Sequence, residues 1–258
     1  MITLKGVSTG YKINKSQKSC RIVHSLPDLK INAGEMICLI GMNGSGKSTL
    51  IRTICRLQTP LNGSVYIDDA NVNSLSDKAL SKKIGVVLST PPDIDNITAN
   101  DVVAMGRYPY TGIFGKLNEI DYNIVTASIH DIGIEKLSDK LFSELSDGEK
   151  QKVMIAKTLC QQTPYIMMDE PMAFLDYSSR IEMSKLLQML TSKMNKAVLL
   201  STHNLELAIE MADKLWVMNT SGGFVECTPG KLLTSSLLAD YFGSDTANWL
   251  TQHFRFEK

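Results

Sequence analysis

The sequence feature that most constrains the fold is a glycine-rich loop between an apolar run and a helical stretch. Its glycines precede a lysine and two hydroxyl residues, in the order Gly41, Met42, Asn43, Gly44, Ser45, Gly46, Lys47, Ser48 and Thr49. Glycines let backbone N–H groups point inward, and the N-terminus of the following helix adds its positive dipole end. The spacing predicts a strand–loop–helix unit that cradles the phosphates of a nucleotide, with Lys47 at the β- and γ-phosphates and the Ser48 hydroxyl on Mg²⁺.

A second apolar run ends in two adjacent carboxylates, Asp169 and Glu170. A continuous apolar run is typical of a central parallel strand, and ligands of such sheets bind beyond the carboxyl ends of the strands. Alone, such a pair is usually a solvated strand exit. Downstream of a phosphate-binding loop, it predicts that Asp169 holds Mg²⁺, directly or through water. Glu170 is then the general base that polarises the attacking water.

Short β-rich runs alternate with helical stretches, which predicts an α/β fold with a mainly parallel sheet. Strands are expected at 36–40, 65–68, 84–88, 165–169 and 197–201, with a hairpin from 215–219 and 224–227. Helices are expected at 48–56, 119–132, 149–161, 178–194 and 204–212, and from near Ser235. No strand is expected between 89 and 161, so this stretch is interpreted as a helical insert in a sheet-based core.

Composition narrows the class of protein. The 258 residues are 43% hydrophobic and 21% charged, as in ordinary globular proteins. Lys+Arg and Asp+Glu balance at 27 each, so net charge favours neither nucleic acid nor anionic lipid as a partner. The five cysteines show no metal-binding spacing. Neither a signal peptide nor a membrane-spanning run is recognisable, so we expect a cytosolic chain that reaches a membrane only through a partner.

A third motif lies between the other two. Leu145, Ser146, Asp147, Gly148 and Glu149 precede a helical stretch. Ser146 and Glu149 have the spacing of a capping box, in which the serine caps the helix and the glutamate reaches back. An exposed helix N-terminus of this kind is also a site for a phosphate.

With this motif the sequence resembles the ABC ATPases, whose LSGGQ signature likewise lies between the P-loop and the acidic strand end. Further matches follow the family order: Tyr11 resembles the aromatic residue that stacks on adenine, and His203 the switch histidine at the γ-phosphate. Phe174, Leu175 and Asp176 resemble the D-loop. The resemblance covers about residues 2–243 and implies a P-loop NTPase (RecA-like) core with an N-terminal antiparallel β portion and a helical subdomain.

The resemblance also implies a domain division and a mechanism. One ATPase domain is expected over 1–243, with its core at about 1–88 and 162–230, a helical subdomain at about 89–161 and a C-terminal extension at 244–258. In the family two cassettes pair head to tail, so the P-loop of one and the signature of the other close on each ATP and its Mg²⁺. Hydrolysis reopens the pair and drives membrane-spanning subunits. This chain therefore needs a second copy, or a paralogue, as its partner.

Two departures from the family pattern affect the site. Ser89 stands where the family has a glutamine that senses Mg²⁺, and its shorter hydroxyl could still take a water or the metal. Asp147 and Glu149 replace a glycine and the glutamine of the signature. Both carboxylates lie near the expected position of the partner's ATP and should weaken its binding unless they point away. We still expect an active enzyme.

Residues 102–110 resemble a segment of cassettes that serve importers of iron–siderophore complexes, haem and cobalamin. This resemblance implies an ATP-hydrolysing subunit on the cytoplasmic face of the bacterial inner membrane. Membrane-spanning permease subunits would hold it there, with a periplasmic substrate-binding protein as an indirect partner. Iron chelates are the first substrate class expected, haem or cobalamin the second. The alternatives are a soluble ABC ATPase without a transport role and a catalytically silent nucleotide-binding module.

Overall fold

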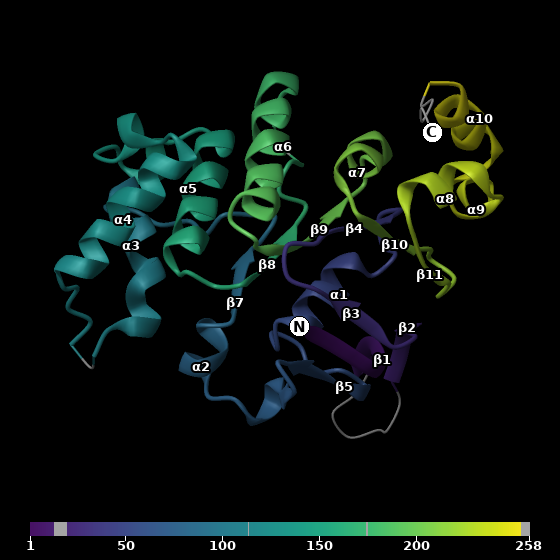
Figure 1. The fold of residues 1–258 in the computed structure, drawn as a ribbon, viewed down its shortest axis with the longest axis horizontal. Helices are drawn as coiled ribbons and strands as arrows, with labels where there is room; N and C mark the ends of the chain where they lie inside the picture. The colour runs from purple at the N-terminus through teal and green to yellow at the C-terminus, as the bar shows by residue number, and fades with distance from the viewer. Residues whose placement is uncertain (13–19, 113, 174, 254–258) are drawn as a thin grey trace.

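The computed structural model describes residues 1–12, 20–112, 114–173 and 175–253. Its centre is a six-stranded sheet in the order β11-β10-β4-β9-β8-β7 (Figure 1). Neighbouring strands from β10 to β7 are parallel, and β11 closes one edge as an antiparallel hairpin with β10. The strands are β4 Met36–Gly41, β7 Ile84–Val87, β8 Tyr165–Asp169, β9 Ala197–Thr202, β10 Lys214–Met218 and β11 Phe224–Cys227.

A second, antiparallel sheet is built mainly from the N-terminal region. Its order is β2-β1-β5-β6, and β3 also pairs with β1. The strands are β1 Ile2–Lys12, β2 Cys20–Ser25, β3 Leu29–Ile31, β5 Asn62–Ile67 and β6 Ala70–Asn71. Helix α1 (Lys47–Ile54) lies between the two sheets and places Leu50, Ile51 and Ile54 in their shared core.

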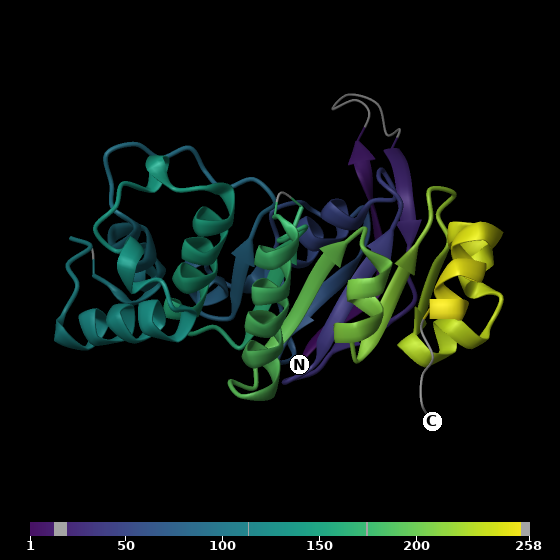
Figure 2. The same ribbon diagram turned by 90° about the horizontal axis from the view of Figure 1, so that it is seen from above.

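Other helices cover the opposite face of the central sheet or extend from its ends (Figures 1 and 2). Helices α6 and α7 pack against the sheet, α8 to α10 gather beyond β11, and α3 to α5 form a group on the side of β7. The α-helices are α2 Asp77–Ser81, α3 Ala99–Ala104, α4 Glu119–Ile132, α5 Asp147–Cys160, α6 Tyr177–Ser192, α7 Leu205–Met211, α8 Pro229–Thr234, α9 Leu237–Phe242 and α10 Ser244–His253. Short 3₁₀ helices are η1 Val72–Ser74, η2 Met105–Tyr110, η3 Glu135–Leu137 and η4 Phe142–Glu144.

The central strands are buried on both faces, which explains their continuous apolar runs. In β4, Ile37 and Leu39 belong to the core on the α1 side, whereas Cys38 and Ile40 belong to the core on the α6 side. Successive side chains of a strand point to opposite faces, so a strand covered on both faces favours apolar residues at consecutive positions. The sheet thereby holds the ends of its strands in fixed positions.

The segment between β7 and β8 is mainly helical, as predicted for this insert. Outside helices and turns, the described residues of 89–161 contain an isolated bridge between Thr98 and Leu141. The single helix expected from near Ser235 is instead two short helices, α9 and α10, and a further helix, α8, precedes them from Pro229. None of the described helices combines the length and the apolar composition that a bilayer crossing requires.

Residues 102–110 hold this helical group together through Arg107. Its Nε lies 2.9 Å from Asp121 Oδ1 on α4, and both side chains are buried. Its Nη1 donates to the Cys160 carbonyl at the end of α5 (3.0 Å), and the guanidinium lies 3.9 Å from the centre of the Tyr110 ring. Burial alone would raise the pKa of Asp121, but the Asn118 N–H and the Arg107 guanidinium lower it below its ordinary value. The segment therefore joins η2, α4 and α5.

Candidate nucleotide site

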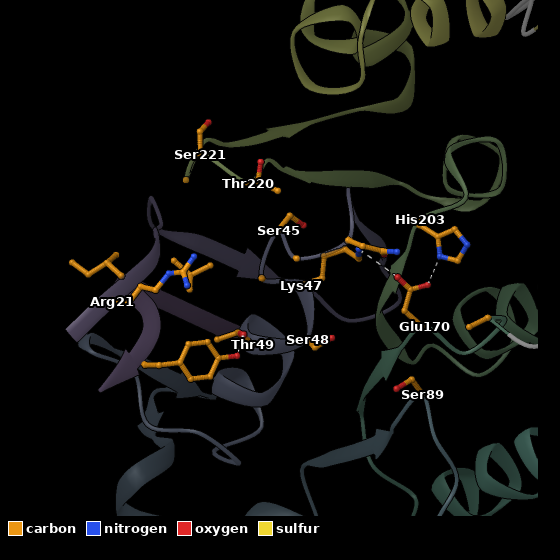
Figure 3. Close-up of a pocket in the computed structure, with 18 residues that line it drawn as sticks. Arg21, Ser45, Lys47, Ser48, Thr49, Ser89, Glu170, His203, Thr220 and Ser221 are labelled. Carbon is orange, nitrogen blue, oxygen red and sulfur yellow. Dashed lines mark hydrogen bonds and ion pairs between the residues drawn. The ribbon is translucent and has the colours of Figure 1, made fainter. Parts of the chain in front are cut away.

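A cavity of about 680 Å³ opens at the carboxyl ends of the parallel strands, between the two sheets (Figure 3). This volume suits a small-molecule ligand. Residues of the glycine-rich loop from Asn43 to Thr49 line it, whereas Gly41 and Met42 do not. The remaining walls are formed by Tyr11, Arg21, Ile22, Val23, Ser89, Glu170, Ala173, His203, Thr220, Ser221 and Gly222. The fold thus gathers most of the predicted site residues.

The glycine-rich loop connects β4 to α1, as predicted. Gly44 and Gly46 have φ values of +80° and +94°, a left-handed conformation that glycine adopts readily. The Lys47 side chain is buried and runs back along the loop, where its Nζ donates to the Gly41 carbonyl at 2.8 Å. The loop therefore presents its lysine and the N-terminus of α1 at one wall of the cavity.

Asp169, at the end of β8, is buried beside the start of α1. Its Oδ1 accepts hydrogen bonds from the Ser48 hydroxyl at 3.0 Å and from the Ser201 hydroxyl at 2.7 Å. Hydroxyl and carboxylate oxygens are ligands that Mg²⁺ prefers, usually together with phosphate oxygens of a substrate. The Ser48–Asp169 pair is therefore a suitable place for the predicted metal.

Glu170 follows directly and points into the cavity. Its Oε1 lies 3.4 Å from Lys47 Nζ, and its Oε2 accepts a hydrogen bond from His203 Nδ1 at 2.9 Å (Figure 3). The Glu170 backbone has a φ of +48°, and its N–H donates to the Ser201 hydroxyl at 2.8 Å. The structure thus brings Lys47, Glu170 and His203 together from three different elements.

Tyr11 lies across the cavity on β1. Its hydroxyl and the Thr49 hydroxyl are 2.7 Å apart, and about half of the side chain is exposed. An aromatic ring fixed by one end at the rim of a cavity offers a face for stacking a planar group.

The signature segment does not reach this cavity within the described part of the chain. Ser146 caps α5, and the Glu149 carboxylate accepts hydrogen bonds from the Ser146 N–H and hydroxyl, both at 2.9 Å. These bonds, the backbone one first, lower the pKa of Glu149 below its ordinary value. Glu149 therefore folds back onto its own helix, whereas Asp147 is exposed.

Asp147 instead lines a neighbouring cavity of about 240 Å³, together with Ser89 and Gln151. Ser89, Glu170 and Ala173 line both cavities, so the two cavities adjoin along these residues. Gly148 faces the D-loop segment, where an added Cβ would lie 3.3 Å from the Leu175 side chain. Asp176 caps α6 by accepting the Ser179 N–H at 2.8 Å, and Phe174 lies outside the described residues.

Sequence reasoning missed Ser201. This buried residue is the first polar position of the β9 run AVLLST and bridges Asp169 to the Glu170 backbone. The available signal was a polar residue closing an apolar strand, the same signal that identified Asp169. What was missing was the order of the strands, because β9 had to be known as the neighbour of β8.

Comparison with known proteins identifies the family. Residues 26–173, more than half of the chain, match the family described as ABC transporter. The chain belongs to the ABC transporter family. It is 38% identical to an uncharacterized ABC transporter ATP-binding protein, MJ0873, of Methanocaldococcus jannaschii, over 86% of this chain and 77% of that protein.

Two further relatives carry transport names. The ferric enterobactin transport ATP-binding protein FepC of Escherichia coli is 31% identical over 83% of this chain and 79% of its own length. The probable siderophore transport system ATP-binding protein YusV of Bacillus subtilis is 32% identical over 83% of this chain and 78% of its own length.

Among solved structures, the dimeric cassette MJ0796, described as a bacterial ABC transporter cassette, superposes with a TM-score of 0.76 at 27% identity. The match covers 89% of this chain and 99% of that one. The predicted P-loop NTPase fold is thereby confirmed, and the chain is an ABC ATPase coupled to transport.

Proposed function

We propose that this ABC ATPase energises an importer of iron chelate complexes, such as iron–siderophore complexes. Support comes from the ferric enterobactin and siderophore names of its relatives. The resemblance of residues 102–110 to iron-chelate, haem and cobalamin importer cassettes points the same way, although this segment acts structurally, through Arg107. Haem and cobalamin are the competing substrates.

The observation that carries the ATPase site is the convergence of Lys47, Glu170 and His203 on one cavity. In our proposal the N–H groups of Asn43 to Thr49 cradle the phosphates of ATP, Lys47 neutralises the β- and γ-phosphates, and Tyr11 stacks on adenine. Ser48 and Asp169 hold Mg²⁺, which supplies charge neutralisation when bound, and Ser89 is a third candidate contact.

Glu170 is the proposed general base. As a water oxygen bonds to the γ-phosphorus, the carboxylate takes the water proton, and the bond to the bridging oxygen of ADP breaks. The His203 N–H holds Oε2, which fixes the orientation of the carboxylate. Lys47 Nζ, 3.4 Å from Oε1, lies beside the other carboxylate oxygen.

The signature residues Ser146, Asp147, Gly148 and Glu149 are proposed to act on the ATP of a second cassette, most simply a second copy of this chain. None of these four residues lines the nucleotide cavity of its own chain, so in this proposal a facing partner supplies the missing half of the site. The D-loop residue Asp176 would lie at this junction. We also retain the division into a core (1–88 and 162–230), a helical subdomain (89–161) and an extension (244–258).

Permease subunits are the proposed membrane partners, with a substrate-binding protein on the far side and this chain on the cytoplasmic face. No nucleic-acid partner is proposed, because positive and negative side chains balance at 27 each. The tagged chain should co-purify with a membrane permease from native membranes. Recovery of the chain free of any permease would favour a soluble ABC ATPase.

Glu170→Gln tests the assignment of the general base. This variant keeps the size and hydrogen-bonding shape of the side chain but cannot accept a proton, so steady-state ATP hydrolysis should fall by about 10²–10⁴-fold. Binding of ATP, measured by titration calorimetry, should remain within about threefold of the parent because the phosphate cradle is unchanged. Unimpaired turnover would rule out Glu170 as the base.

Uptake measurements test the substrate. Cells that lack this protein should fail to accumulate ⁵⁵Fe supplied as a ferric siderophore, and the parent chain, but not Glu170→Gln, should restore uptake. Labelled cobalamin and haem serve as parallel substrates in the same cells. Loss of cobalamin or haem uptake with normal iron uptake would overturn the iron-chelate proposal.

A further inference from the structure

A buried histidine lies directly behind the glycine-rich loop. His24 is on β2, at the edge of the antiparallel sheet, paired across the ladder with Thr9. It is 1% exposed, whereas Arg21, Ile22 and Val23 on the same strand line the nucleotide cavity. The strand therefore forms a wall of the site and also sends one ring into the core beneath the loop.

The ring is bonded to the loop backbone. His24 Nε2 lies 2.6 Å from the carbonyl oxygen of Ser45. A carbonyl can only accept a hydrogen bond, so Nε2 carries the hydrogen and donates it. Among the described residues, His24 is the one side chain from outside the segment Gly41–Ser48 that hydrogen-bonds to that segment's backbone.

The next residue of the loop is pressed against the same strand. A Cβ added at Gly46 would lie 2.6 Å from the Val23 side chain and 3.3 Å from His24 Cδ2. Gly46 also has a left-handed φ of +94°. The Ser45–Gly46 peptide is thus held from behind by β2, while Ser45 and Gly46 line the cavity in front.

We propose that His24 is a positioning residue that aims the Gly46 amide at the phosphates of ATP. The Ser45 carbonyl and the Gly46 N–H belong to one planar trans peptide and therefore point in opposite directions. Anchoring the carbonyl on His24, behind the loop, directs the N–H into the cavity in front. A preset amide donor stabilises bound phosphate more than one that must first be ordered.

The other ring nitrogen supports this role. Nδ1 of His24 is buried and has no hydrogen-bond partner among the described residues. An unpaired buried polar atom costs free energy that an apolar side chain of similar size would avoid. An imidazole at this position is therefore less favourable than an apolar side chain of similar size, unless its Nε2 hydrogen bond to the loop offsets the difference.

Three substitutions of His24 distinguish its hydrogen bond to the loop from the space that its ring fills. In glutamine the amide nitrogen is three bonds from Cβ, as Nε2 is in histidine, whereas in asparagine it is two bonds away, as Nδ1 is. His24→Leu and His24→Asn should raise the dissociation constants for ATP and ADP by about tenfold, which corresponds to about 1.4 kcal/mol. His24→Gln should remain within about threefold of the parent.

Dissociation constants are measured by titration calorimetry in the Glu170→Gln background, and unfolding temperatures are recorded without nucleotide. If His24 only fills space, His24→Leu will bind ADP as tightly as the parent, or His24→Gln will bind it as weakly as His24→Asn; either result overturns the proposal. If His24→Leu fails to fold, the comparison of His24→Gln with His24→Asn tests the proposal.

The inference rests on the proposed ATP site, so Lys47→Ala serves as the reference. If Lys47→Ala weakens ATP binding and His24→Leu does not, the role of His24 is rejected and the ATP site is retained. If Lys47→Ala binds ATP as tightly as the parent, the proposed ATP site itself is rejected.

Discussion

At the scale of single residues, one buried hydroxyl hydrogen-bonds to both acidic residues of the site. Ser201 donates to Asp169 and accepts the backbone N–H of Glu170. Glu170 has a φ of +48°, a conformation that costs about 1–3 kcal/mol for a residue other than glycine. The hydrogen bond from its N–H helps to offset this cost, so the strained turn can present its carboxylate to Lys47 and His203.

Ser201→Ala should therefore reduce turnover more than nucleotide affinity. We expect kcat for ATP hydrolysis to fall about 10–10²-fold through misplacement of Glu170, with a KM for ATP near that of the parent. The free energy of unfolding in urea should fall by about 1–3 kcal/mol, because the Glu170 N–H loses its partner. Ser184→Ala, which removes a hydroxyl that donates to the Arg180 carbonyl within α6, is the control. An equal loss of kcat in both variants would contradict this account.

At the scale of elements, the N-terminus of α5 carries one acidic side chain that bonds to its own helix and one that is exposed. The Glu149 carboxylate completes the capping box, so its charge is directed at Ser146. Asp147, one position into the helix, is exposed and makes no such bond within the described part of the chain. Of the two acidic departures from the signature, Asp147 is therefore the one that would face the phosphates of a partner's ATP.

This difference predicts the effect of neutralising each carboxylate. In the Glu170→Gln background with ATP, Asp147→Asn should lower the dimer dissociation constant several-fold, because it removes a like charge from the interface. Glu149→Gln retains the capping geometry and should change the constant by less than about twofold. Sedimentation velocity measures both. A larger gain from Glu149→Gln would mean that its carboxylate, not that of Asp147, faces the nucleotide.

At the scale of the whole molecule, the helical group joins the core at one sheet edge. It leaves after β7 and returns at β8, which are neighbours, and α5 packs on β7 where Gly85 leaves room for Thr158. The buried Arg107–Asp121 pair ties the group together at a distance from the nucleotide cavity. Its loss should therefore affect stability before it affects catalysis.

Acid should weaken this ion pair. The pKa of Asp121 in the folded protein lies below its ordinary value of about 3.9, so its stabilising contribution is present above that value and is lost as the pH falls through the folded pKa. Asp121→Asn should lower the free energy of unfolding by about 3–5 kcal/mol at pH 7, because Arg107 is left unpaired. The gap to the parent, measured in urea, should narrow at acidic pH. The exposed Glu119→Gln is the control, and a gap that widens in acid would contradict the assignment.

Much of the fold could be predicted because its signals are local. The apolar run 165–169 is the strand β8 to the residue, and the predicted helix 119–132 is α4, since period, caps and turn residues act over a few positions. The C-terminal helices were less predictable: Ser235 and Gly243 interrupt a stretch in which weak propensities compete, and packing beyond β11 decides the outcome.

By itself the sequence determined the glycine-rich loop, the two adjacent carboxylates where β8 ends and the capping box of α5, because each is encoded in the spacing of adjacent residues. Only the tertiary structure decided that Ser201 hydrogen-bonds to both acidic residues, that His24 contacts the Ser45 carbonyl and that Arg107 is a buried anchor. These contacts join residues 14 to 53 positions apart in the chain. They exist because β9 was placed beside β8 and β2 behind the loop, and that order follows from packing whole elements together.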